Sequence, residues 1–521
     1  MALAQARATQ SPFSKGYEQL DELVACLESE DARHMTHSEI ERELRERGRE
    51  IMRLMLQGYL DSRASEEAAE PVIDAQNVER TSKRQQERAL ETEFGTVSVE
   101  RVGYGGPPGG ESLHPLDAAL NLPKERYSHE LRRRAAEEAA KSSFDEVVEA
   151  LSRHTGAHVG KRQVEQLVVR AARDFDAFYE DRQRRADSNT TAGSIVVLTF
   201  DGKGVVMRQQ DLREATRKAA ERRRHRCKTR LSKGEKRNAK RMSTVASVYT
   251  LEPYVRTPEQ VARTLAPVHE AVEGRRPRPE NKRVWASLEK TPEEVIEGAF
   301  HEAFRRDPKR ERLWVAQVDG NPTQIEILET LARKHRIALT IVLDVIHVLE
   351  YLWKGGRVFL EEGTQELERW VNERFLRVLQ GNCCEVASEI TASAIQSKLD
   401  AKQTKPVEDC ARYLRDHKKY LAYETCLSKG LPIATGVIEG ACRHLIKDRM
   451  DVTGARWSLK GAEAVLRLRA LRSSHDFDEY WAFHEKREYE LNHVARYLRG
   501  KVPILNGSRT TNGKPTLVIV K

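Results

Sequence analysis

Four apolar, β-branched segments in the middle of the chain constrain its fold more than any other feature. They are SIVVLTFDGKGVVM (194–207), STVASVYTLEPYV (243–255), LWVAQVDGN (313–321) and IALTIVLDVIHV (337–348). Short apolar runs rich in valine and isoleucine predict buried strands. Residues 257–308 are expected to be mostly helical and charged, and the helical PTQIEILETLARKH follows the third run. Strands that alternate with helices predict an α/β sheet, at least partly parallel.

The rest of the chain has a mainly helical pattern. Residues 15–90 are helical and highly charged, and LETEFGTVSVERVGYGG (90–106) alternates as a hairpin or short strand does. Residues 141–172 predict two helices around a turn, with Lys161 and Arg162 at the start of the second. This is the outline of a DNA-binding helix-turn-helix, and a plain helical hairpin explains it equally well. From 349 to about 493 the pattern is helical again.

The charge balance points to a polyanionic partner. The 521 residues carry a formal net charge of +9, and the strongest basic feature is the stretch 213–241. Such a cluster neutralises phosphates and gives salt-sensitive, sequence-independent DNA affinity, although it could also be a solvated arm. The seven cysteines are scattered without a CxxC pair, and no secretory signal or membrane span is evident, so we expect a cytoplasmic protein. The candidate DNA-binding residues of the stretch are Arg222, Arg223, Arg224, Arg226, Lys228 and Arg230.

Three aspartates follow apolar strand segments. Asp201 comes after IVVLTF, Asp319 after LWVAQV and Asp344 after LTIVL. Each one alone is ordinarily a turn former or a helix cap. Open α/β sheets, however, place their sites at the carboxyl ends of the strands, so three such acids in one basic protein favour a shared site. Carboxylates that converge suit Mg²⁺, and two such ions about 4 Å apart can clamp an in-line phosphoryl transfer.

A fourth acid, Glu439, lies in the stretch ATGVIEGACRHLIKDRMDVTGARWS (434–458). Helical spacing predicts that it shares a face with Arg443, Ile446, Lys447 and Met450. On local grounds it is either a metal ligand or an acid that favours a helix N-terminus and pairs with Arg443. Trp457 could stack on a base, although a packed tryptophan is the commoner case. The basic residues that could hold a DNA strand beside Glu439 are Arg443, Lys447, Arg449 and Arg456.

Four motifs in this order carry a family resemblance: LTFDGKG, VDGNPTQ, LDVIHVLEYLW and TGVIEGACRHLIKDRMDVTGARWS. Together they resemble bacterial insertion-sequence transposases of the ISKra group, which belong to the DDE transposases with a ribonuclease-H-like core. The resemblance covers residues 193–472 most closely. The cysteine-pair zinc ribbon that related transposases often carry near the N-terminus has no counterpart in VSVERVGYGGPPGGESLHPLD.

The resemblance implies a catalytic triad of Asp201, Asp319 and Glu439 that holds Mg²⁺ or Mn²⁺, with two ions expected. The pair Asp344 and His347 resembles a D-x-x-H element of related Mutator-like transposases. Asp344 is therefore the reserve for the second acid, and His347 a candidate to contact the scissile phosphate, to orient a metal-bound group or to anchor the following helix.

The resemblance also implies a domain plan and partners. Residues 191–350 and 431–475 would form the ribonuclease-H-like core, with a helical insertion at 351–430. A mainly helical DNA-binding region, 1–190, precedes the core, and a helix and tail, 476–521, follow it. The expected activity is cleavage and strand transfer on double-stranded DNA by a homodimer or larger assembly. Two alternatives are a ribonuclease-H-like nuclease without strand transfer, and a domesticated protein that only binds DNA.

Overall fold

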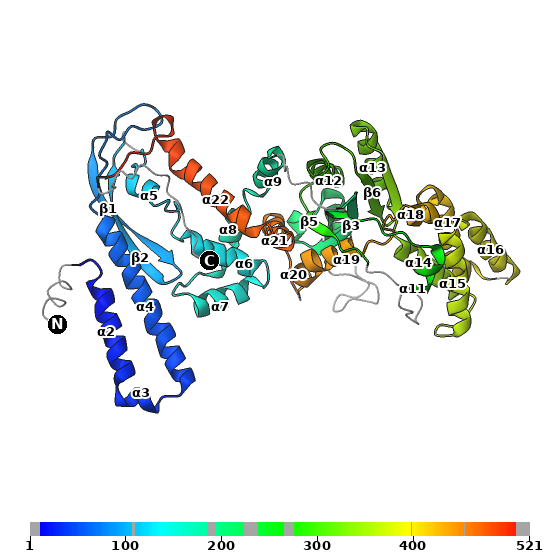
Figure 1. Ribbon diagram of the computed structural model, residues 1–521, viewed down its shortest axis with the longest axis horizontal. Helices are drawn as coiled ribbons and strands as arrows, with labels where there is room; N and C mark the ends of the chain where they lie inside the picture. Colours follow the sequence, from blue (N-terminus) through cyan, green and yellow to red (C-terminus); the bar gives the residue numbers. More distant parts are fainter. Residues whose placement is uncertain are drawn as a thin grey trace. The chain divides into compact units, whose positions relative to one another are not determined.

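The computed structural model describes residues 11–106, 110–185, 193–222, 238–264, 276–397, 399–452 and 454–506 (Figure 1). The chain divides into two compact units. Met1–Asp174 and Asp478–Lys521 form one, which we call the terminal unit, and Phe175–Phe477 form the other, the sheet unit. Both combine helices with a sheet, so the fold is mixed α/β. No described helix is long and apolar enough to cross a membrane.

A five-stranded mixed sheet forms the centre of the sheet unit, in the order β5-β4-β3-β6-β7. β3, β4 and β5 pair antiparallel, whereas β6 pairs parallel with both β3 and β7. Four strands correspond to the four segments that the sequence predicts, and most of their apolar side chains are buried, with Met242 and Leu313 exposed. The bounds are β3 Ile195–Val206, β4 Lys240–Leu251, β5 Glu280–Ser287, β6 Leu313–Val318 and β7 Leu339–Leu343.

β5 corrects the expectation that residues 257–308 are mostly helical. Only α11, Pro258–Thr264, and α12, Pro292–Arg306, are helices in the described part of that range. The sequence of β5, ENKRVWAS, opens with three exposed polar residues and buries only its second part. Its apolar run is therefore too short to stand out, and pairing with β4 decides its conformation.

The position of Asp201 also differs from the prediction. β3 does not end before it but continues to Val206, because β4 pairs with it along its whole length. The parallel pairing with β6, by contrast, ends where Thr199 faces Gln317. Asp201 therefore lies within β3, just beyond the point where β6 stops covering that edge.

Helices flank the sheet and connect its strands. α12 packs on β3 and β4, α13 contacts β6 and β7, and α21 packs on β5. α12 begins with a capping box in which Thr291 and Glu294 satisfy each other's backbone amides, and Pro292 occupies its first turn. The remaining bounds are α9 Phe175–Arg184, α10 Glu214–Arg222, α13 Pro322–His335, α14 Val345–Gly356, α19 Gly436–Ala441 and α21 Leu459–Ser473.

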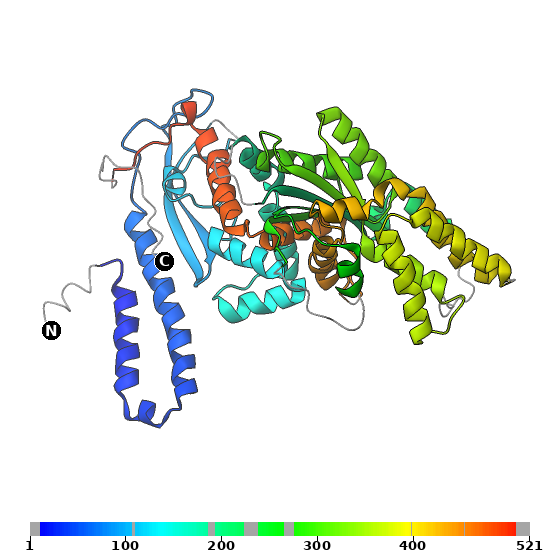
Figure 2. The same cartoon turned by 45° about the vertical axis from the view of Figure 1, so that its right-hand side comes forward.

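The range 351–430 is helical, as predicted, wherever the structure describes it. α14 packs on α15 and α17, and α16 packs on both of these (α14 is green and the other three are yellow to olive in Figures 1 and 2). Buried apolar residues recur along one side of each helix, for example Leu367, Val371 and Phe375 in α15. The bounds are α15 Gln365–Leu379, α16 Cys383–Gln396, α17 Ala401–Asp416 and α18 Tyr423–Ser428.

The terminal unit contains a long helical pair and a hairpin. The expectation that residues 15–90 are helical is wrong after Arg63, because β1 begins at Lys83, well before the predicted hairpin range of 90–106. β1 and β2 pair antiparallel in unbroken register, and α4 packs on β2. α7 and α8 are the two helices expected near 141–172, and both pack against α6. The bounds are α2 Ser14–Glu28, α3 Glu30–His34, α4 His37–Arg63, β1 Lys83–Thr92, β2 Gly95–Tyr104, α5 Pro115–Ala119, α6 His129–Ala139, α7 Phe144–His154, α8 Lys161–Ala171 and α22 Phe477–Asn492.

From the sequence we place domain boundaries at residues 190 and 475; the structure divides the chain after Asp174 and Phe477. α9 therefore belongs to the sheet unit, where Tyr179 Oη donates to Asp476 Oδ2 at 2.9 Å. The C-terminal segment is not a separate part but completes the terminal unit, where Leu505 forms a β-bridge with Ala68. Two distant parts of the chain thus share one core.

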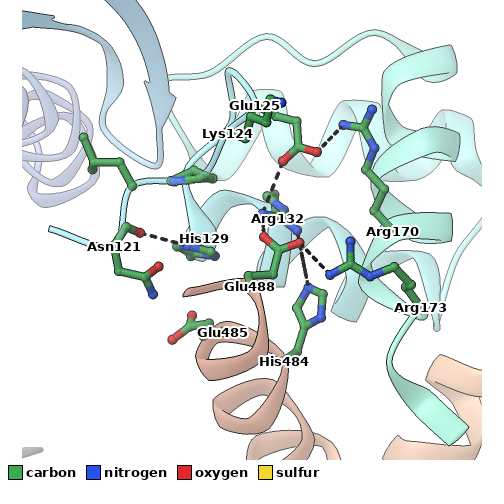
Figure 3. A network of polar contacts seen from close by, with 12 residues as sticks. Asn121, Lys124, Glu125, His129, Arg132, Arg170, Arg173, His484, Glu485 and Glu488 are labelled. Atoms are coloured by element: carbon green, nitrogen blue, oxygen red, sulfur yellow. Dashed lines mark hydrogen bonds and ion pairs between the residues drawn. The ribbon is translucent and has the colours of Figure 1, made fainter. Parts of the chain in front are cut away.

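A buried polar network joins α22 to α6 inside the terminal unit (Figure 3). Arg132, which is fully buried, lies 2.6 Å from Glu488 Oε2 through Nη1 and 3.3 Å from His484 Nε2 through Nη2. His484 Nδ1 in turn lies 2.7 Å from Asp174 Oδ2, and Arg173 contacts Glu488 Oε1 at 3.2 Å. Arg132, Asp174 and Glu488 are buried, and each has a partner of opposite charge, as burial of a charge requires.

Candidate active site

Asp344 ends β7 and caps the N-terminus of α14. Its Oδ1 accepts from the amides of Ile346 and Thr435, both at 3.2 Å. Its Oδ2 accepts from Thr435 Oγ1 at 2.7 Å and hydrogen bonds with His347 Nδ1 at 2.9 Å. The side chain is fully buried. Burial opposes ionisation, but the hydrogen bonds from His347 and Thr435 keep its pKa below the usual value.

These contacts assign Asp344 a structural role. A carboxylate has room for about four hydrogen bonds, and Asp344 already makes four. It therefore connects α14 to the segment before α19 and holds His347, with little capacity left for a metal ion. The pair also affects His347, because the hydrogen bond to Asp344 raises the pKa of the imidazole despite partial burial.

Asp319 lies at the turn after β6 and is half-buried. Its Oδ1 accepts from the Asn321 amide at 3.0 Å, and Gly320 follows with φ 96°. The backbone of this turn is held by α17 and the residue after it: Tyr413 Oη donates to the Asp319 carbonyl at 3.0 Å, and His417 Nε2 bonds to the Gly320 carbonyl at 3.1 Å. The negative charge of Asp319 contributes to the raised pKa of His347, which places the two side chains near each other.

Asp201 is also half-buried, on β3. Its Oδ1 accepts from the Gly202 amide at 2.6 Å, and its Oδ2 accepts from the thiol of Cys442 at 3.0 Å. Burial and the nearby Asp201 charge raise the pKa of Cys442, so the sulfur remains a protonated donor. Cys442 was not identified from the sequence, where only its position three residues after Glu439 hinted at a shared neighbourhood.

Glu439 projects from α19 into the same neighbourhood. Burial of its carboxylate raises its pKa, and the negative charges of Asp344, Asp201 and Glu350 raise it further, while His347 opposes them. Such repulsion acts over short distances. Glu439 therefore interacts electrostatically with Asp201, Asp344 and His347, and His347 with Asp319, so that four separate segments of the chain contribute to one charged neighbourhood.

The helix after Glu439 is not the uniform α-helix that we expect from the sequence. Cys442–Lys447 is wound as a π-helix, which changes the angular spacing of the side chains. Ile446 and Met450 are buried, whereas Arg443 and Lys447 are exposed, so these four do not share one face and that prediction is wrong. Arg443 lies 3.7 Å from Asp448 Oδ1, and no ion pair joins it to Glu439 in the described structure.

The candidate DNA-binding residues have different environments. Arg449 is buried with its guanidinium 4.8 Å from the Trp457 ring centre, so its assignment to a DNA surface is wrong. Trp457 is itself packed, and its Nε1 donates to the Met450 carbonyl at 3.1 Å. Lys161 is exposed on the first turn of α8 and pairs with Asp145 at 2.6 Å. The other exposed candidates are Arg162, Arg222, Arg443, Lys447 and Arg456. Arg223, Arg224, Arg226, Lys228 and Arg230 lie outside the described residues.

The donor atoms of the three acids are carboxylate oxygens, which suit a hard divalent cation. A cation would also relieve the repulsion that raises the pKa of Glu439. Within the described ranges, however, no three His, Cys, Asp or Glu side chains are arranged so that they could hold one ion. The chemistry and the location of these residues therefore suit a divalent cation, but their side chains are not arranged to bind a single ion together.

The comparisons with known proteins add no assignment: no family model matches the chain, and no curated protein matches it.

Proposed function

We propose that this chain is a DNA transposase of the DDE type, with a ribonuclease-H-like core that cleaves DNA and joins its ends. The observation that carries the proposal is the convergence of Asp201, Asp319 and Glu439 beside His347, from positions more than a hundred residues apart in the chain. Packing alone gives no reason to collect acidic side chains at one sheet edge, because their mutual repulsion costs stability.

The sheet supports the same proposal. In a ribonuclease-H-like core the first acid is expected on the central strand and the second on its parallel neighbour. Here Asp201 lies on β3, the third of the five strands, and Asp319 directly follows β6. The third acid comes after the helical range 351–430, where the resemblance implies an insertion.

Each residue has a defined part in this mechanism. Asp201, Asp319 and Glu439 would hold Mg²⁺ or Mn²⁺, which when bound activates a water and stabilises the charge on the phosphodiester. Cys442 orients Asp201 through its thiol, and Asp344 orients His347 toward the acids. A protonated His347 offers its other ring nitrogen to a phosphate oxygen. Exposed Arg443, Lys447 and Arg456 lie on the chain segment that follows Glu439, where a bound strand needs neutralising charge.

The proposal further includes a cytoplasmic protein that acts on double-stranded DNA, as a homodimer or larger assembly that holds two ends. A ribonuclease-H-like nuclease would use the same acids but would not join a precleaved end to target DNA. A domesticated DNA-binding protein would show neither reaction.

The test is Asp201→Asn, assayed with DNA carrying the ends of the element and with a precleaved end. We expect both cleavage and joining to fall by at least about a hundredfold, since a metal ligand supplies several kcal/mol of stabilisation to the transition state. Asp416→Asn changes an exposed aspartate of the same unit and should act like the wild type. Cleavage by Asp201→Asn at the wild-type rate would show that the triad is wrongly assigned, and cleavage without joining in the wild type would favour the nuclease.

A further inference from the structure

A cavity of about 950 Å³ opens in the sheet unit on the other side of the short helix that carries Glu439. Its walls come from β5, α12, α19 and the turn after α21, all labelled in Figure 1. Six arginine or lysine side chains line it, against two carboxylates. The cations are Arg182, Arg278, Lys282, Arg283, Arg305 and Arg306, and the carboxylates belong to Glu302 and Asp476.

One carboxylate forms ion pairs with three arginines in the wall of this cavity. Glu302 Oε2 lies 2.9 Å from Arg283 Nη1, and Glu302 Oε1 lies 2.9 Å from Arg305 Nη2 and 2.8 Å from Arg306 Nη2. Burial disfavours the charge on Glu302, but Arg306, Arg283 and Arg305 together hold its pKa well below the usual range. Because Glu302 stays ionised, its single charge leaves an excess of two positive charges in this cluster.

Arg306 has a donor that the protein does not satisfy. The residue is only 6% exposed, and its Nη1 has no hydrogen-bond partner in the described structure. A buried guanidinium nitrogen without an acceptor costs free energy. Because Arg306 lines the cavity, its positive charge attracts an anion bound there. At the rim, Arg278 and Lys282 are exposed and form no ion pair with any described residue, so their charges are also available.

Another wall is formed by α19 with two glycines. Gly436, Val437, Gly440 and Ala441 line the cavity, and a Cβ added at Gly436 or Gly440 would meet no atom within 4 Å. A ligand can therefore lie directly against this helix. Glu439 leaves the same helix toward Asp201 and Asp344, so a chain that lies along α19 reaches both the cavity and the acids.

We propose that this cavity binds the phosphodiester backbone of the DNA strand whose scissile bond lies at the acids. The inference rests on the proposed function and assigns its strand-holding surface. No phenylalanine, tyrosine or tryptophan belongs to the described lining, and its cations favour contacts with phosphates, which do not depend on sequence. The cavity is at the upper end of the about 300–1,000 Å³ that small-molecule pockets occupy, which suits a strand segment better than a single phosphate.

The test measures the salt dependence of DNA binding by fluorescence anisotropy, with a labelled duplex carrying a single-stranded end and Ca²⁺ in place of Mg²⁺. We expect Arg278→Gln with Lys282→Gln to weaken binding and to reduce the slope of log K against log salt by about 2, because each lost phosphate contact removes about 0.9. The matched control is Lys402→Gln with Lys405→Gln, which removes the same charge from exposed sites on α17.

A second variant tests whether DNA binding requires the open space of the cavity, without changing its charge. Gly440→Gln places a neutral side chain in the open region beside α19, where nothing opposes it in the unbound protein. We expect the variant to keep the wild-type thermal unfolding midpoint and to bind the same DNA at least about tenfold more weakly, since a displaced strand loses one or more phosphate contacts.

The outcomes separate this inference from the proposed function. One outcome is that the wild type binds and cleaves DNA while Arg278→Gln with Lys282→Gln shows the same slope of log K against log salt as the control variant. In that case the cavity is not the strand site and the proposed function stands. If inorganic pyrophosphate competes as strongly as an unlabelled strand, the ligand is a small anion and the inference fails. If the wild type binds no DNA at any salt concentration, both the inference and the proposed function fail.

Discussion

Single residues in this chain acquire their roles from their surroundings. Asp319 and Asp344 each follow a strand and look alike in the sequence. The fold makes Asp344 a fully buried cap with four hydrogen bonds, while the Asp319 side chain accepts one from the Asn321 amide. The choice between them as the second candidate ligand depends on this difference in hydrogen bonding, because a carboxylate that is already saturated is poorly available to a metal ion.

His129 shows the same dependence on surroundings in the terminal unit. Its Nε2 hydrogen bonds to the Asn121 carbonyl at 3.1 Å (Figure 3), and burial, followed by the charge of Arg132, lowers the pKa of the imidazole to about 4. The folded state therefore binds a proton less readily than the unfolded chain, whose histidine pKa is about 6.5. Above about pH 6.5 His129 is neutral in both states and costs no stability. As the pH falls toward 4, the unfolded chain is protonated first, and the free energy of unfolding decreases.

We predict that His129→Gln removes part of this acid sensitivity. Between pH 7 and pH 5 the wild-type terminal unit should lose about 2 kcal/mol of stability through His129, which the variant retains. Hydrogen exchange at the amides of α6 measures this loss. His158→Gln, which changes an exposed histidine of the same unit, should behave as the wild type. An identical loss in His129→Gln would mean that other groups carry the acid sensitivity.

At the scale of elements, the helical range between β7 and α19 supports the candidate site. Tyr413 of α17 donates its hydroxyl to the Asp319 carbonyl and stacks on Tyr351 of α14, with ring centres 4.1 Å apart. Tyr423 of α18 donates to the Leu343 carbonyl at 3.0 Å, directly before Asp344. The helices α17 and α18 therefore stabilise the turns that carry Asp319 and Asp344.

We predict that Tyr413→Phe loosens the turn at Asp319. Loss of one hydrogen bond to a buried carbonyl should destabilise the sheet unit by about 1 kcal/mol and raise the Mg²⁺ concentration required for half-maximal cleavage. Tyr420→Phe is the matched control, because its hydroxyl bonds to the exposed helix α13 at Glu329 and not to the turn. Urea unfolding and a magnesium titration measure the two effects. An unchanged magnesium requirement would limit Tyr413 to a role in stability.

At the scale of the whole molecule, the terminal unit is closed by a helix from the far end of the chain. α22 supplies Glu488 and His484 to a network whose other members, Arg132, Arg173 and Asp174, come from the first 174 residues. The first third of the chain therefore lacks part of its core until α22 is present.

We predict that Glu488→Gln destabilises the terminal unit alone. Arg132, which is fully buried, would lose its nearer carboxylate partner at 2.6 Å and keep Glu125 at 3.6 Å, and breaking a buried pair in this way costs about 3 kcal/mol. Hydrogen exchange should increase in α6 and stay unchanged in β3 and β6. Glu490→Gln alters an exposed glutamate of the same helix and should have no effect on either unit. Equal destabilisation of both units would mean that they unfold as one.

Much of the fold and of the candidate site follows from local patterns. The runs that contain β3, β4 and β6 are apolar because both faces of these strands are largely buried. Asp201 and Asp319 are conspicuous because each interrupts or follows such a run, and Glu439 because it lies among small and apolar residues. β5 escapes prediction because its first three residues are polar and exposed and its apolar run is short. Tyr413 and Cys442 escape it because nothing nearby in the sequence connects them to Asp319 or Asp201.

The sequence by itself determined four of the five strands of the sheet unit and most of the helical ranges, because burial imposes a periodicity on the order of apolar residues. Only the tertiary structure decided which charged groups meet. It surrounded Glu439 with Asp344 and Asp201, buried Arg449 on Trp457, and collected three arginines around Glu302. The physical reason is that electrostatic interactions depend on distance in space and on burial, and the local order of residues determines neither quantity.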